Sequence, residues 1–180
     1  GVRDAMVDYL SAEAAKVFEA CREVSLASGV PVEEGKLSAS VFMRPYLRWL
    51  LNLANEQLNC GRYLRSLDTC EEILRLDAAD AVGARLVMAY DYVKLEDEQG
   101  MEALAARFPQ QVNAWFMLAR CFLAYKARRL DEATTMLHDI VLAYPSAGRT
   151  LYYQEEIPLG TFGHLECVPM SADELFIAVS

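Results

Sequence analysis

The segment from Pro45 to Asp80 constrains the fold of this chain most, because it contains two amphipathic helical patterns separated by one break. Apolar residues three and four positions apart lie on one face of an α-helix. In the first pattern these are Leu50, Leu53 and Ala54, and in the second they are Leu67, Cys70, Ile73 and Leu74. Gly61 separates the patterns and is typical of a helix end. The segment therefore predicts two antiparallel helices joined by a short turn.

Two further segments repeat this arrangement. In 81–109 the apolar positions of the first helix are Ala84, Val87, Met88, Tyr90 and Tyr92. A short second helix, 98–108, carries Gly100 where a small residue is expected. From Gln110 onward the third unit has Trp115, Leu118, Ala119, Phe122 and Leu123 in its first helix, and Ala133, Leu137, Ile140 and Val141 in its second. A single helix pair cannot bury its apolar face alone, so the three units are expected to stack.

These units resemble the tetratricopeptide repeat, a helix pair of about 34 residues with fixed small and large apolar positions. The resemblance covers 44–145, and the second unit is trimmed to 29 residues. It implies an all-α fold in which helical hairpins form a right-handed superhelix with a concave groove. It also implies peptide or protein binding. The clamp that some members use for a chaperone tail is not expected, because Leu51, Leu86, Asn113 and Met117 occupy four of its five positions and only Asn55 matches.

The segments on either side of the repeats differ in texture. Residues 1–43 contain a helical pattern over 4–27, either one helix or two with a new start at Ser11, and then a polar connection. Residues 146–180 predict a mixed, partly extended segment followed by a final helix, which Ser171 and Glu174 open as a capping box. We therefore expect one compact domain, built from an N-terminal capping helix, three repeats (44–145) and this C-terminal segment. It can be part of a longer protein.

Groove-facing positions of the first helices are the candidate partner-binding residues. They are Arg48, Asn55, Asn59, Arg85, Tyr92, Asn113, Phe116 and Arg120. Each first helix contributes one arginine, and arginine binds carboxylates through two charge-assisted hydrogen bonds. This pattern favours an acidic or extended peptide as the partner. In the alternative interpretation, the arginines pair with Glu56, Asp91 or Glu102 and only solvate the surface.

Charge and cysteine usage restrict the remaining function classes. With 26 acidic and 17 basic residues, the chain has a net charge of −9, which disfavours binding to a phosphate backbone. It has no apolar run long enough to cross a membrane. The five cysteines are odd in number and form no C-x-x-C pair, which indicates free thiols in a reducing compartment, the cytoplasm or the nucleus.

The sequence contains no recognisable catalytic constellation. His138 stands alone on a helix, and His164 with Cys167 supplies only half of the four ligands that a structural zinc site needs. We therefore expect no enzymatic activity, no cofactor and no metal. The leading prediction is a non-catalytic scaffold that binds a peptide or partner protein in its concave groove. The alternatives are a helical-repeat RNA-binding protein and a module that self-associates into a homo-oligomer through its end faces.

Overall fold

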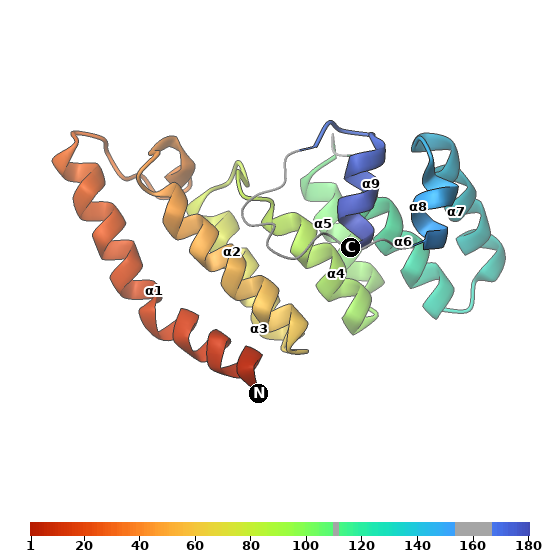
Figure 1. Cartoon of the computed structure of the whole chain (residues 1–180), viewed down its shortest axis with the longest axis horizontal. Coiled ribbons are helices and arrows are strands. Elements are labelled where there is room, and N and C mark those ends of the chain that lie inside the picture. The colour runs from red at the N-terminus through yellow and green to blue at the C-terminus, as the bar shows by residue number, and fades with distance from the viewer. Residues whose placement is uncertain (110–111, 154–166) are drawn as a thin grey trace. The chain divides into compact units, whose positions relative to one another are not determined.

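The computed structural model describes residues 1–109, 112–153 and 167–180, and these residues form nine α-helices and no strand (Figure 1). The helices are α1 (Val2–Ala27), α2 (Arg44–Asn59), α3 (Tyr63–Leu76), α4 (Ala84–Leu95), α5 (Glu98–Arg107), α6 (Ala114–Lys126), α7 (Leu130–Ala143), α8 (Ala147–Tyr153) and α9 (Ala172–Val179). They group into two compact units, Gly1–Asp91 and Tyr92–Ser180, which divide within α4. The all-helical class is thus confirmed for the described residues, whereas the right-handed superhelix stays a prediction.

In the first unit, α1 is a single bent helix that packs along α2 (Figure 1). Val7 and Leu10 of α1 form a buried apolar cluster with Leu53 of α2. The indole N–H of Trp49 donates a hydrogen bond to the carbonyl of Leu10, at 2.9 Å. Since one continuous helix supplies this contact face, Ser11 begins no new helix.

The pair α2–α3 is held together at small side chains. Ala54 is fully buried, and the hydroxyl of Ser66 in α3 donates to its carbonyl at 3.0 Å. Gly61 has a φ of +75° in the turn between the two helices, a conformation that costs glycine little. The helix break predicted at Gly61 is therefore a turn in which this glycine adopts the left-handed backbone conformation between α2 and α3.

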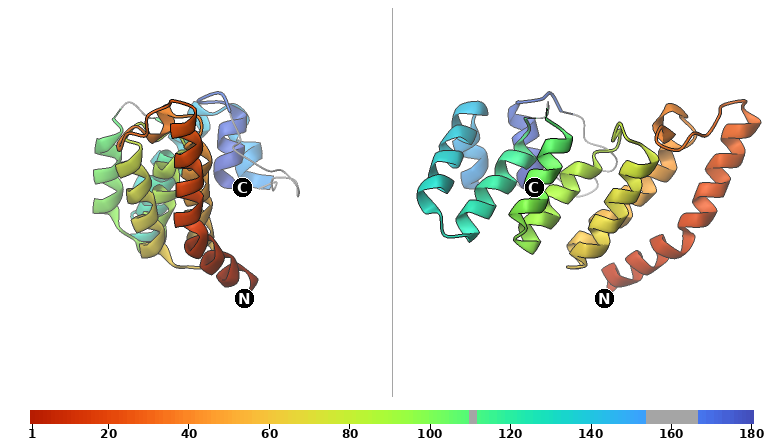
Figure 2. Two further views of the ribbon diagram at one scale, coloured as in Figure 1. Left: turned by 90° about the vertical axis from the view of Figure 1, so that its left-hand side faces the viewer. Right: turned by 180° about the vertical axis from the view of Figure 1, so that it is seen from behind.

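In the second unit, α6 and α7 are adjacent helices joined by a short turn (Figure 2). Their shared core is completed by residues from α8 and α9. The buried members are Ala114, Leu118, Cys121, Ile140, Tyr144, Ala147, Leu175 and Ala178. The small residues Ala119 and Ala133 are buried as well, 0 % and 7 % exposed, as expected for positions of close helix approach.

Glu174 is a charged residue that is only 4 % exposed, and it connects α9 to this core. Its carboxylate accepts hydrogen bonds from the N–H of Ala114 at 2.7 Å, the hydroxyl of Tyr144 at 2.5 Å and the N–H of Met170 at 2.8 Å. Ser171 caps α9 as expected, accepting from the N–H of Glu174 at 3.2 Å. The side chain of Glu174, however, spans to α6 and the end of α7 rather than to the N–H of Ser171. Burial and this carboxylate raise the pKa of Tyr144.

One expectation for the C-terminal segment is wrong: 147–153 forms α8 instead of an extended or irregular stretch. Its aromatic and β-branched residues favour strand only weakly, and tertiary packing overrides such preferences. Ala147 is buried in the α6–α7 core, and Leu151, one turn later, packs against it. The residues 154–166, which the same expectation covered, lie outside the described residues.

Replacing Glu174 with Ala should destabilise the protein by about 2–4 kcal/mol, because the buried N–H of Ala114 and the hydroxyl of Tyr144 would lose their acceptor. Urea unfolding followed by circular dichroism measures this loss. The control is Asp173→Ala, which removes an exposed carboxylate from the same first turn of α9. Equal midpoint shifts for the two variants would contradict the assigned role of Glu174.

Candidate functional site

The predicted binding residues of the first unit lie on one face of α2 and at the start of α4. Arg48, Asn55 and Asn59 are seven and four positions apart, so they lie on the same face of α2. Arg48 and Asn59 are exposed, and Arg48 makes no ion pair among the described residues. These side chains are accessible, and none of the three lines the cleft of the second unit described below.

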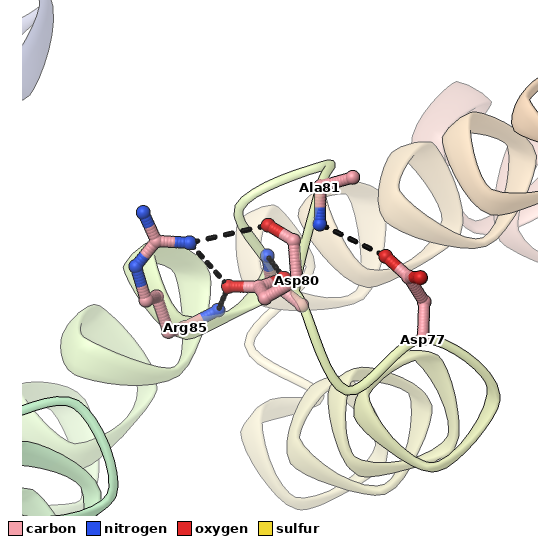
Figure 3. A network of polar contacts seen from close by, with 5 residues as sticks. Asp77, Asp80, Ala81 and Arg85 are labelled. Atoms are coloured by element: carbon pink, nitrogen blue, oxygen red, sulfur yellow. Dashed lines mark hydrogen bonds and ion pairs between the residues drawn. The ribbon is translucent and has the colours of Figure 1, made fainter. Parts of the chain in front are cut away.

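Arg85, in contrast, belongs to a buried polar network at the turn between α3 and α4 (Figure 3). Its guanidinium lies 2.6 Å from the carboxylate of Asp80, whose side chain is fully buried. The same carboxylate accepts from the backbone N–H groups of Ala84 at 2.7 Å and of Arg85 at 3.1 Å, and so caps α4. Arg85 therefore neutralises a buried charge, a role that neither interpretation anticipated: its partner is Asp80 rather than Glu56, Asp91 or Glu102, and the pair lies within the protein rather than on its surface.

Asp77 provides the second anchor of this turn. It is 0 % exposed, and its carboxylate accepts from the hydroxyl of Ser38 at 2.6 Å. It also accepts from the N–H of Ala81 at 2.9 Å (Figure 3). The connection before α2, expected to be merely polar, is thereby tied to the end of α3. It also buries Leu37, which is 2 % exposed.

Tyr92 of the second unit lies against the short helix α5. A Cβ atom at Gly100 would lie 2.3 Å from the ring of Tyr92, so no larger residue fits there. This close approach explains the small residue read at that position in the sequence. The ring of Tyr92 is half-buried and serves the α4–α5 contact rather than projecting freely.

The other three predicted residues, Asn113, Phe116 and Arg120, line one cleft of about 520 Å³ in the second unit. Residues of α5, α6 and α7 line it together with Phe108, Pro109, Val112 and Asn113. The described residues that line it are Glu102, Ala105, Ala106, Phe108, Pro109, Val112, Asn113, Phe116, Met117, Arg120, Met136 and Asp139. Most of these side chains are apolar, and Val112 is 65 % exposed. The cleft can therefore bind apolar groups, which is the usual character of a ligand-binding cleft.

Of the charged side chains that line the cleft, two pair with each other and one has no partner among the described residues. Arg120 donates two hydrogen bonds to Glu102, at 2.8 and 2.7 Å. These bonds raise the pKa of the Arg120 guanidinium and leave its fork occupied. Asp139 is exposed and makes no hydrogen bond or ion pair among the described residues. The cleft thus presents an apolar wall, one satisfied ion pair and one free carboxylate.

Asn113 has a structural role at the edge of the cleft. Its side-chain oxygen accepts from the N–H of Phe116 at 3.0 Å and caps α6. Its side-chain nitrogen is buried and has no hydrogen-bond partner among the described residues. The residue therefore shapes the cleft by fixing the start of α6, and its unpaired N–H₂ faces no acceptor in the described protein.

Sequence reasoning missed the part of the cleft that comes from second helices. It considered only first helices as groove walls, whereas Ala105 and Ala106 of α5 and Met136 and Asp139 of α7 complete the lining. The sequence signal that could have indicated this part of the cleft is the pair Ala105 and Ala106 at the end of α5, just before Pro109. Small side chains at a helix end leave space that a neighbouring helix does not fill.

Asp91 is a buried titratable group outside the cleft. It is 0 % exposed, and neither carboxylate oxygen has a hydrogen-bond partner among the described residues. Burial raises its pKa to about 7, while nearby Ser66, whose hydroxyl donates to Ala54, opposes the shift. Asp91 and burial also raise the pKa of the Cys70 thiol, with burial the larger cause. This thiol is therefore protonated and packs as a small apolar group.

Comparison with protein-family models, with curated proteins and with solved structures finds no match for this chain. None of the helices in the described ranges combines the length and apolar composition needed to span a membrane. In the same residues, no group of three or more His, Cys, Asp or Glu side chains is arranged to hold a metal ion. His164, one half of the H-x-x-C pair, lies outside the described residues.

Replacing Arg85 with Ala should destabilise the protein by about 2–4 kcal/mol, because it removes the partner of a buried carboxylate. Arg48→Ala is the matched control, and its exposed side chain should change stability by less than about 0.5 kcal/mol. Thermal and urea unfolding of both variants measure the difference. If Arg85→Ala were as stable as the parent, the buried network would not depend on this arginine.

Asp91 should make stability depend on pH. Its folded-state pKa of about 7 lies above the value of about 3.9 in an unfolded chain, so the folded state retains the proton between these limits. Stability is then lost as pH rises from about 4 to about 7, by about 4 kcal/mol in total, and does not fall further above that range.

Urea unfolding of the parent and of Asp91→Asn at pH 5, 6, 7 and 8 tests this dependence. The variant should gain stability relative to the parent as pH rises. Asp68→Asn, at an exposed position of α3, should show no such gain. A constant difference between the parent and Asp91→Asn over this range would contradict a buried, protonated Asp91.

Proposed function

We propose that this chain is a non-catalytic protein-binding module and that the cleft enclosed by α5, α6 and α7 binds an apolar segment of a partner protein. The observation that carries the proposal is the open, mainly apolar cleft of about 520 Å³, which collects three of the predicted partner-binding residues. A cleft of this size accepts a few side chains of a peptide rather than a whole domain.

The side chains around the cleft fit recognition better than chemistry. Among the described lining residues, the ionisable ones are Glu102, Arg120 and Asp139, and none is a histidine, cysteine or serine. Glu102 and Arg120 neutralise each other. Phe108, Phe116, Met117 and Met136 supply aromatic and flexible apolar surface, which is enriched where proteins bind one another. Methionine in particular adapts its shape to different ligands.

The likeness to tetratricopeptide repeats supports the same class of function. Stacked helix pairs of that family act as binding scaffolds, and the described helices follow the predicted order of pairs. Under the proposal, the second unit binds through a cleft that α5 and α7 also line, not through first helices alone. The face of α2 with Arg48, Asn55 and Asn59 is then a secondary surface.

A cleft-filling substitution tests the proposal. Ala106 and Ala103 are both exposed on α5, but only Ala106 lines the cleft. Peptides are first selected from a random displayed library on the full chain. Ala106→Trp should weaken their binding at least about tenfold, which is the loss of roughly one buried apolar contact, while Ala103→Trp should bind like the parent.

Two outcomes would contradict the proposal. One is a library selection that enriches no peptide above background. The other is a set of selected peptides that bind Ala106→Trp as tightly as the parent. Circular dichroism of both tryptophan variants confirms that their helical content is unchanged, so that loss of binding reports on the cleft.

A further inference from the structure

Asp139 is the feature of the cleft that the apolar lining does not explain. It lies on α7 three positions after Met136, so the two side chains are on the same side of the helix. Its carboxylate is exposed and, among the described residues, pairs with no cation. A ligand that fills the cleft would lie beside this negative charge and would shield it from water.

The other two charged groups of the cleft do not compensate Asp139. Glu102 and Arg120 satisfy each other through two hydrogen bonds, at 2.8 and 2.7 Å. The three charged residues in the described lining therefore sum to −1, within a chain whose net charge is −9. An acidic ligand would be repelled by both the local and the overall field, and a basic one would be attracted.

We infer that the partner segment is amphipathic and basic: apolar side chains occupy the cleft, and an adjacent lysine or arginine pairs with Asp139. This inference rests on the proposed function of the cleft and specifies the chemistry of its ligand. It replaces the acidic peptide expected from the sequence. Two of the three arginines behind that expectation, Arg85 and Arg120, are already engaged with Asp80 and Glu102.

A basic ligand for this cleft determines which peptides a library selection should yield. Peptides whose binding is lost in Ala106→Trp should be enriched in lysine or arginine next to leucine, methionine or phenylalanine. One such peptide and the same peptide with its basic residue replaced by methionine then serve as the two probes. Affinity is measured by fluorescence anisotropy at about 50 mM and about 500 mM salt, which span strong and weak screening.

Asp139→Asn should weaken binding of the basic peptide about fivefold at low salt and less at high salt, as a pair at the edge of a cleft does. The methionine form of the peptide should bind the parent and Asp139→Asn equally. Asp68→Asn, which removes the same charge from an exposed and unpaired position of α3, should leave the affinity for both peptides unchanged.

The outcomes separate this inference from the proposed function. If selected peptides depend on Ala106 but carry no basic residue, or bind Asp139→Asn like the parent, the basic ligand is wrong and the protein-binding cleft stands. Equal losses in Asp139→Asn and Asp68→Asn would indicate attraction to overall charge and would also overturn the role of Asp139. If the selected peptides bind Ala106→Trp as tightly as the parent, the proposed function itself is wrong.

Discussion

Close contact between neighbouring helices at small side chains is the constraint on which the rest of this structure depends. Ala54 and Ser66 let α2 and α3 approach until a hydroxyl bonds a backbone carbonyl at 3.0 Å. Gly100 admits the ring of Tyr92 where even a Cβ atom would clash. Dispersion attraction stabilises such contacts only at short range, so each pair of helices tolerates little change in side-chain volume at the contact.

Buried carboxylates provide a second kind of connection between helices, through hydrogen bonds to backbone and side-chain donors. Asp77 and Asp80 hold the α3–α4 turn, and Glu174 joins α9 to α6 and Tyr144. Each of these three carboxylates has several donors within hydrogen-bonding distance, which offsets the cost of its burial. Asp91 differs, because it is equally buried but has no donor among the described residues. The unpaired group is the one whose pKa is raised to about 7.

The same pairing of charges determines which charged side chains of the cleft are already occupied within the protein. An arginine whose fork is filled by a neighbouring carboxylate offers little to a ligand, and Arg120 is in that state beside Glu102. The free carboxylate of Asp139 then sets the sign of the cleft. Counting arginines along the chain does not show which of them a ligand can reach, because the count does not reveal their partners elsewhere in the fold.

Local signals were enough to predict the helices of 44–145 from periodicity, the turn at Gly61 from its glycine and the cap at Ser171 from the capping-box motif, because these depend on residues within one or two turns. The resemblance to the repeat family assigned Asn113, Phe116 and Arg120 to one face, and the structure brings the three together in one cleft. Contacts between distant residues had to come from the tertiary structure. Tertiary packing made 147–153 helical, left Leu137 and Val141 43 % exposed, and occupied Arg85 with Asp80. Burial and charge pairing are properties of what lies opposite a side chain, and a local pattern does not contain that information.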